Sequence, residues 1–122
     1  MTLVLAPGLY IVATPIGNLG DLSPRAAEIL LNADIVAVED SRVTAGLFRH
    51  LGARRPMTPY HDHNAEAVRP GLVARMASEA VALVSDAGTP LISDPGFKLV
   101  RDARAAGHAV TTIPGPCAGI AA

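Results

Sequence analysis

The chain has 122 residues, enough for one compact domain and too few for two of ordinary size. Half of them are apolar, which favours a buried core over disorder, and a formal net charge of −1 excludes attachment to nucleic acid or anionic lipid through bulk charge. The one cysteine, Cys117, excludes an internal disulfide, no leader is recognisable before Leu9, and no apolar run approaches the roughly 20 residues of a membrane span. We therefore expect a soluble, cytoplasmic protein without a membrane partner.

A strand and a helix are predicted at the start of the chain. Leu9–Thr14 is rich in β-branched and aromatic residues and lies between turns that contain Pro and Gly, which is typical of a strand. Ser23 followed by Pro24 is typical of a helix N-cap and first helical position. The apolar face of this helix is expected to comprise Ala27, Leu30 and Leu31.

A second strand and helix follow directly. Ile35–Val38 is apolar on both faces and predicts a buried strand, after which Glu39-Asp40-Ser41 supply helix-capping side chains. Met57–Tyr60 is a weaker strand candidate because it contains a proline. The intervening helix is expected to end at Gly52 and to have an apolar stripe of Val43, Leu47, Phe48 and Leu51.

The second half of the chain repeats the pattern twice. Asn64 is a candidate cap for a helix with Val68, Leu72 and Met76 on one face, although Pro70-Gly71 within it costs several kcal/mol unless the helix begins nearby. Val81–Val84 is a predicted strand, and Asp94-Pro95 is typical of a helix start. That helix is expected to end at Gly107, and Ala109–Ile113 is a fifth strand. Its apolar face should comprise Leu99, Val100, Ala103 and Ala106.

Strands that are apolar on both faces and separated by helices predict an α/β fold with a five-stranded parallel sheet flanked by helices. The chain closes with Cys117–Ala122, small apolar residues that resemble the first turns of another helix. We expect residues 1–122 to form a single N-terminal α/β domain of a two-domain protein, with the C-terminal domain absent from this chain.

Four loops that follow predicted strands are expected to meet at one edge of the sheet, because right-handed crossovers bring all carboxyl ends of parallel strands there. Their Gly and Pro residues allow a polar small molecule to approach main-chain groups. The first loop lacks the glycine spacing of a dinucleotide-binding turn, and no phosphate-binding P-loop motif occurs, which disfavours ordinary dinucleotide or triphosphate binding. The loops are Thr14–Leu19, Glu39–Arg42, Ser85–Gly96 and Pro114–Ala118.

Several of these segments resemble one known family. Leu9–Ser23 (LYIVATPIGNLGDLS), Glu39–Arg42 (EDSR), Tyr60–Asn64 (YHDHN), the Ser85–Gly96 loop and Ile113–Pro116 (IPGP) are similar to ribosomal RNA small subunit methyltransferase I. That family methylates the 2′-oxygen of a cytidine in small-subunit (16S) ribosomal RNA and belongs to the tetrapyrrole methylase superfamily. The resemblance extends from about Leu9 to Ala122.

The resemblance implies a cytoplasmic homodimer in which S-adenosylmethionine lies between the two domains of each subunit and small-subunit rRNA is the substrate. The isolated fragment would then bind the cofactor weakly and be inactive. The family more often has Ser where Cys117 stands and Thr where Ser41 stands, so a backbone contact is expected at Cys117 because a thiol is a weak hydrogen-bonding group. The cofactor-binding residues it implies are Pro15, Ile16, Asp86, Ala87, Gly88, Thr89, Pro90, Cys117 and Ala118.

Methyl transfer to a ribose hydroxyl requires in-line placement and removal of the hydroxyl proton, and needs no metal. The candidates for orienting or deprotonating that hydroxyl are Glu39, Asp40, His61 and Asn64. Arg42 suits a backbone phosphate or a carboxylate. We select Asp40 and Arg42, with Glu39, as the catalytic residues, although helix capping alone also explains Asp40.

Two further groups of residues keep alternative interpretations. Strand alternation would divide the triplet His61-Asp62-His63 between the two faces of a strand, and no second cluster completes a metal site, so no metal is expected. The one local basic concentration, Arg49, His50, Arg54 and Arg55, suits either a helix C-terminus or RNA.

Two other functions remain open. A tetrapyrrole methyltransferase of the precorrin or uroporphyrinogen type would use the same scaffold, although such relatives have a compact Gly-Asp-Pro loop where this chain has the longer segment 85–90. A non-catalytic nucleotide-binding module is the alternative from a different class.

Overall fold

The computed structural model describes residues 5–13, 22–39, 41–85 and 94–113. Its strands form one all-parallel sheet in the order β3-β2-β4-β1-β5. The α/β fold with a five-stranded parallel sheet is therefore confirmed. The strands are β1 (Gly8–Ala13), β2 (Ile35–Val38), β3 (Thr58–Pro59), β4 (Ala80–Ser85) and β5 (Val110–Ile113).

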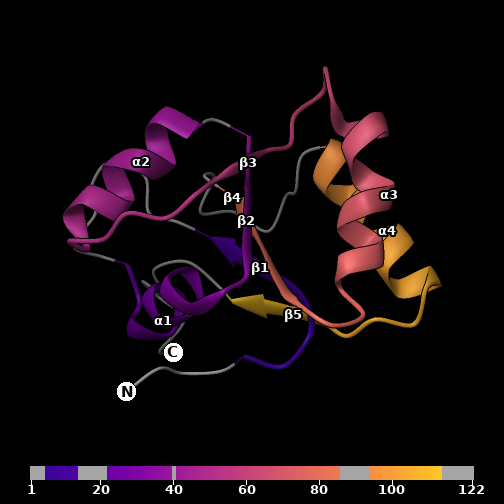
Figure 1. Ribbon diagram of the computed structural model, residues 1–122, viewed down its shortest axis with the longest axis horizontal. Helices are drawn as coiled ribbons and strands as arrows, with labels where there is room; N and C mark the ends of the chain where they lie inside the picture. The colour runs from indigo at the N-terminus through magenta and orange to yellow at the C-terminus, as the bar shows by residue number, and fades with distance from the viewer. Residues whose placement is uncertain (1–4, 14–21, 40, 86–93, 114–122) are drawn as a thin grey trace, which may run out of the picture.

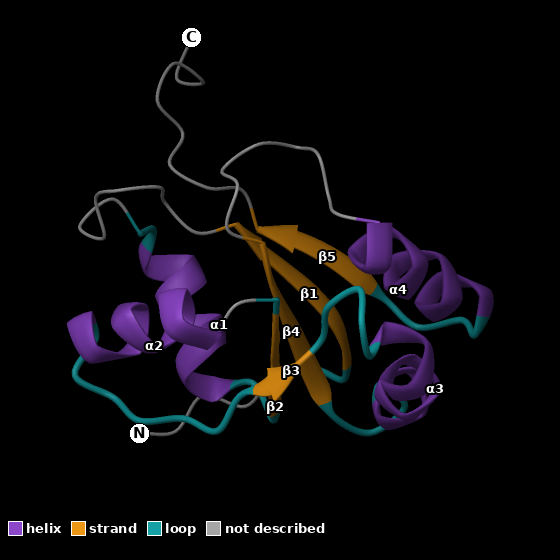
Figure 2. Cartoon of the chain, turned by 90° about the horizontal axis from the view of Figure 1, so that it is seen from above, coloured by secondary structure: helices purple, strands orange, loops and turns teal. Residues whose placement is uncertain are grey.

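Helices cover both faces of the sheet (Figure 1; Figure 2). One face is packed by the first two helices and the other face by the last two. None of the described helices is long and apolar enough to cross a membrane. The helices are α1 (Pro24–Asn32), α2 (Ser41–His50), α3 (Ala65–Arg75) and α4 (Asp94–Ala105).

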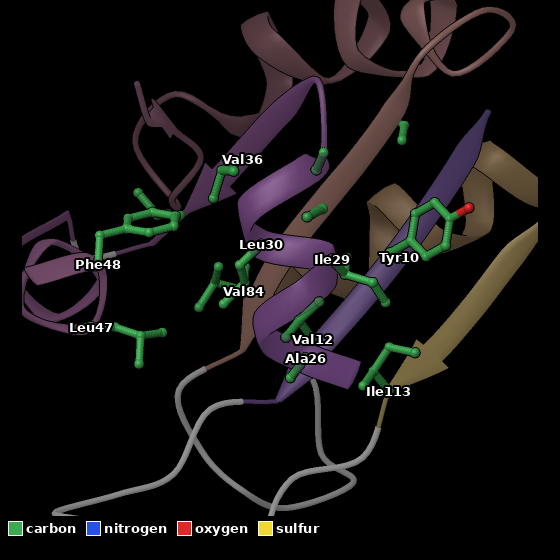
Figure 3. Packing of buried hydrophobic residues seen from close by; sticks show 14 residues of the cluster. Tyr10, Val12, Ala26, Ile29, Leu30, Val36, Leu47, Phe48, Val84 and Ile113 are labelled. Carbon is green, nitrogen blue, oxygen red and sulfur yellow. The ribbon is translucent and has the colours of Figure 1, made fainter. Parts of the chain in front are cut away.

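The central strands are buried on both sides, which explains their continuous apolar sequence. In β4, Ala82 and Val84 pack in the cluster beneath α1 and α2, whereas Val81 and Leu83 pack in the cluster beneath α3 and α4. Figure 3 shows the first cluster, where Val84 lies close to side chains of α1. Alternation of side chains along each strand thus divides the core into two layers.

The predicted strands are confirmed within one residue at each described end, except the third. Of Met57–Tyr60, only Thr58–Pro59 is strand, at the edge of the sheet where a proline costs no ladder hydrogen bond. The Tyr60 amide still donates to the Val38 carbonyl at 2.7 Å, so the chain stays beside β2 for one more residue.

The buried face of α1 differs from the prediction by one residue. The helix starts as expected, with Ser23 Oγ accepting from the Ala26 amide at 3.1 Å. Leu31, however, is 37% exposed, and Ala27 is only half-buried. A shift of one position turns an α-helix by about 100°, so the helix presents a different stripe to the sheet. Its buried residues are Ala26, Ile29 and Leu30.

In α3 the helix runs through Pro70, instead of beginning near it. Asn64 is at the N-cap position as predicted, but its side chain makes no capping bond. The amide of Ala65 donates to the His61 carbonyl at 2.9 Å and that of Val68 donates to the Asn64 carbonyl at 3.0 Å, so the backbone itself supports the first turn. Burial of Leu72 and Met76 holds the helix on the sheet despite the proline.

The last helix, α4, buries Leu99, Val100 and Ala103 as expected, but Ala106 lies beyond its end and is exposed. In α2, Leu47 and Phe48 are buried as predicted, and Leu51 packs against them from the turn that follows. Gly52 and Gly107 follow the two helices with φ of +71° and +84°, a left-handed conformation that glycine adopts without strain.

Candidate active site

The carboxyl ends of the strands meet at one edge of the sheet, as predicted. Ala13 at the end of β1 pairs with Ser85 at the end of β4, and Val12 pairs with Ile113 at the end of β5. On the other side of β4, Ala37 pairs with Leu83, which brings the end of β2 to the same edge. In open α/β sheets this edge is where ligands bind.

Most of the predicted site residues directly follow these strand ends in sequence. Among the described ones, Glu39 follows β2 and is half-buried, and Arg42 lies exposed in the first turn of α2. Thr44, one turn into α2, is buried at 2% exposure. The remaining predicted residues lie outside the described part of the chain: Pro15, Ile16, Asp40, Asp86, Ala87, Gly88, Thr89, Pro90, Cys117 and Ala118.

The segment after β3 that contains His61 and His63 is a turn, although the sequence analysis treated it as a strand. The two imidazole rings lie near one another, with centroids 5.8 Å apart and planes at 68°. The argument from strand alternation is therefore wrong for this triplet, because a turn does not alternate its side chains. Across the described residues, no group of three or more His, Cys, Asp and Glu side chains could hold a metal ion.

Asn64, one of the candidates for orienting the hydroxyl, has a structural role. Its Oδ1 accepts from the His61 amide at 2.8 Å, and its Nδ2 donates to the Pro59 carbonyl at 2.9 Å. These bonds close the turn between β3 and α3, an arrangement typical of Asn in turns. The Nδ1 of His61 is buried without a hydrogen-bond partner among the described residues.

A buried network around Tyr60 was missed by the sequence analysis. Tyr60 has no exposed surface, and its hydroxyl donates to the Pro95 carbonyl and accepts from Arg69 Nε at 3.0 Å. Burial raises the pKa of Tyr60, against the lowering effect of Arg69, so the hydroxyl stays protonated as a donor. The bond to Tyr60 in turn raises the pKa of Arg69, which is 9% exposed.

This network joins the end of β3 to the first turn of α4, the helix that begins at Asp94 within the Ser85–Gly96 segment. It borders a small hollow of about 180 Å³ that is lined by residues of both charges, the acidic Asp62 and Glu66 and the basic Arg69 and Lys98. The available signal was a tyrosine directly after a strand and an arginine on the otherwise apolar face of α3.

The basic residues after α2 divide into two kinds. Arg55 is half-buried and donates to the carbonyl of Leu30 at 3.1 Å and to that of Ala33, at the C-terminal end of α1. Arg49 and Arg54 are exposed. One member of the cluster is thus structural, and the others face solvent.

A family model described as Tetrapyrrole (Corrin/Porphyrin) Methylases matches residues 8–122. The chain belongs to this family. The match begins at the first residue of β1 and covers every helix and strand that the structure describes.

Individual members of the tetrapyrrole methylase family confirm the predicted resemblance. The chain is 58% identical over 118 residues to the ribosomal RNA small subunit methyltransferase I of Xylella fastidiosa (strain Temecula1 / ATCC 700964), covering 95% of this chain and 43% of that protein. It is 55% identical over 119 residues to the protein of that name from Mesorhizobium japonicum, covering 97% and 40%, respectively. It is 50% identical over 115 residues to the Escherichia coli O157:H7 protein of that name, covering 93% of this chain and 40% of that protein. The chain thus spans about two fifths of these relatives.

Solved structures share the fold. A conserved hypothetical protein from Aeropyrum pernix K1 superposes with a TM-score of 0.71 at 26% identity, over 91% of this chain and 39% of that one. Uroporphyrin-III-C-methyltransferase from Thermus thermophilus superposes with a TM-score of 0.68 at 23% identity, over 91% and 48%, respectively. Both solved chains therefore share the fold of this domain.

Proposed function

We propose that this chain is the N-terminal α/β domain of a two-domain, S-adenosylmethionine-dependent methyltransferase that acts on the ribose 2′-hydroxyl of a cytidine in small-subunit rRNA. The observation that carries the proposal is the 50–58% identity, over 93–97% of this chain, to proteins named ribosomal RNA small subunit methyltransferase I. Because the chain spans only 40–43% of those relatives, a second domain completes the enzyme in this proposal. The isolated chain is then inactive.

The carboxyl edge of the sheet is suited to S-adenosylmethionine. The ends of β1, β4 and β5 are adjacent, and in open α/β sheets ligands bind at this edge. The cofactor has a polar adenosine and an amino-acid group, which main-chain amides and carbonyls can bind without much net charge. We infer that Pro15, Ile16, Asp86–Pro90, Cys117 and Ala118 hold it.

When bound, S-adenosylmethionine supplies a methyl group on a positively charged sulfur. Transfer of that methyl group to the ribose oxygen would leave S-adenosylhomocysteine and one proton, which the protein would have to accept. In our proposal Asp40 accepts that proton, Arg42 holds a neighbouring phosphate or the Asp40 carboxylate, and Glu39 helps to orient the ribose hydroxyl. No metal takes part.

We propose further that the complete enzyme is a cytoplasmic homodimer whose partner is the small ribosomal subunit. The net charge of −1 on this chain requires that the RNA be bound through a local basic surface or through the second domain.

The test of the proposed function is the identity of the methyl acceptor. The full-length protein is incubated with methyl-labelled S-adenosylmethionine and either purified small ribosomal subunits or uroporphyrinogen III. We expect label on a ribose of the rRNA and none on the macrocycle. Label on the macrocycle alone would replace our proposal with the tetrapyrrole alternative.

A further inference from the structure

A second surface of the domain has the chemistry of a phosphate-binding site. Helix α2 and the connection to β3 enclose a surface hollow of about 430 Å³. Phe48 and Met57 contribute apolar side chains to it, while Arg49, Arg54 and Arg55 contribute positive charge. No Asp or Glu occurs anywhere in residues 41–61, so the local charge is positive although that of the chain is −1.

Arg55 fixes the place of this hollow in the fold. Its guanidinium donates to the carbonyls of Leu30 and Ala33, which hold the connection against the end of α1 just before β2 begins. Because Arg55 lines the hollow and bonds to the end of α1, the hollow lies toward the amino edge of the sheet, away from the strand ends of the candidate active site. Along β2, with four residues, the two edges are separated by about 13 Å.

Arg49 and Arg54 lack the ion-pair partners that several other exposed arginines have. In the described part of the chain neither has an ion-pair partner, and the Arg49 guanidinium lies back along α2 beside Gly46. Three other exposed arginines are paired within their own segments, Arg25–Glu28 at 3.8 Å, Arg75–Glu79 at 2.6 Å and Arg101–Asp102 at 3.0 Å, whereas Arg104 in α4 has no ion-pair partner among the described residues.

The helix dipole accounts for only part of this cluster. Arg49 and His50 lie in the last turn of α2, where a cation is favourable without any ligand. Arg54 is four residues beyond the end of the helix, and the dipole effect falls off within the last turn. The helix dipole therefore does not explain why Arg54 lies beside the same hollow as Arg49.

We propose that this hollow binds the sugar-phosphate backbone of the substrate RNA, as a contact separate from the site of methyl transfer. The inference rests on the proposed function, because the occupant it names is the rRNA of that reaction. Unpaired arginines suit phosphate oxygens, with which the guanidinium forms paired hydrogen bonds. Since the hollow is remote from the strand ends, it affects how tightly RNA is held and not the transfer step itself.

The test uses the full-length enzyme with Arg49→Gln and Arg54→Gln combined. Binding of purified small subunits is measured from 50 to 300 mM KCl, and kcat and KM are measured for both substrates. The slope of log K for RNA binding against log[KCl] becomes less steep by roughly 0.7 to 0.9 for each phosphate contact that is lost. We therefore expect this salt slope to decrease in magnitude by about 1.4 to 1.8 in the double variant, and RNA binding at low salt to be roughly tenfold weaker. The KM for subunits should rise, with kcat and the KM for S-adenosylmethionine unchanged.

Arg104→Gln is the matched control, because Arg104 is an exposed arginine in the last turn of α4 on the other face of the sheet. It should leave the salt slope unchanged. If the salt slope of RNA binding is unchanged in the double variant, the proposal is overturned. It is also overturned if sedimentation shows that the variant changes its oligomeric state while its RNA binding stays the same. If the wild-type enzyme binds RNA through these arginines but does not methylate small subunits, the proposed function fails and the RNA-binding hollow stands. If the wild-type enzyme binds no RNA, both proposals fail.

Discussion

Tyr60 connects three parts of the domain through a single hydroxyl group. The residue follows β3, its hydroxyl bonds to the first turn of α4, and Arg69 reaches it from α3. Both the Pro95 carbonyl and Arg69 Nε depend on this buried oxygen as a partner. An unpaired polar group in such a place costs more than an ordinary hydrogen bond contributes.

Tyr60→Phe should therefore lower the free energy of unfolding of the chain by about 2 kcal/mol. The matched control is Tyr10→Phe, which loses one bond of 2.7 Å to the Ala6 carbonyl and should cost about 1 kcal/mol or less. Urea unfolding of the three proteins measures both values. Equal losses in the two variants would show that the Tyr60 network contributes no more than a single hydrogen bond.

The catalytic assignment is also tested at one residue. Asp40→Ala in the full-length enzyme should lower kcat by about 10² to 10⁴, because a positioned base is lost, while the affinity for S-adenosylmethionine stays the same. The control is Asp62→Ala, an exposed acidic residue in the turn after β3. Steady-state methylation of small subunits and calorimetry with the cofactor give both quantities. Undiminished turnover would remove Asp40 from the mechanism.

At the scale of elements, α3 keeps its shape against a local cost. Pro70 has no amide hydrogen to donate to the Glu66 carbonyl, and Gly71 next to it is a poor helix former. Both residues are exposed, while the opposite face of the helix buries Leu72 and Met76. Tertiary packing thus outweighs the preference of the local sequence.

Replacing Pro70 with Ala should raise the free energy of unfolding by about 1 to 3 kcal/mol, since the missing hydrogen bond can form. Gly71→Ala should raise it by about 0.5 to 1 kcal/mol, because no atom lies within 4 Å of the new Cβ. Thermal unfolding of both variants makes the comparison. A destabilised Pro70→Ala protein would mean that the proline fits this helix without strain.

The contrast between local sequence preference and tertiary packing also explains which strands and helix faces could be predicted from the sequence. The strands were predictable because continuous apolar runs such as Ile35–Val38 leave little alternative in a helix-covered sheet. The buried face of α1 was not predictable from the sequence. Two apolar stripes lie one residue apart on this helix, and only contact with the sheet selects between them. The residues of the two stripes are Ala26, Ala27, Leu30 and Leu31.

The candidate site was predictable in outline only. Parallel strands bring their carboxyl ends together, so the edge that carries Glu39 and Arg42 followed from topology. The Tyr60–Arg69–Pro95 network joins residues up to 35 positions apart, and no local pattern in the sequence indicates such a contact. Side-chain pairing across elements is a result of packing.

At the scale of the whole molecule, the domain has two edges with different chemistry. The carboxyl edge gathers the strand ends, which the proposed cofactor residues follow in sequence, and the amino edge carries the exposed arginines of the hollow beside α2. Because the chain spans about two fifths of its relatives, we expect the cofactor site to be only half complete here.

The isolated chain should consequently bind S-adenosylmethionine at least roughly 100-fold more weakly than the full-length protein, since half of the buried surface of the ligand would be lost. Calorimetry on both proteins measures the ratio. Equal and tight binding by the 122-residue chain would favour the alternative of a self-contained nucleotide-binding module.

The most direct test of the account is where S-adenosylmethionine protects the protein. Hydrogen exchange of the full-length enzyme, followed by mass spectrometry with and without the cofactor, reports this peptide by peptide. We predict slower exchange in peptides that follow β1, β4 and β5, covering residues 13–22, 85–96 and 113–118, with residues 49–57 unchanged. Protection confined to the amino edge, with none in those three segments, would contradict the account.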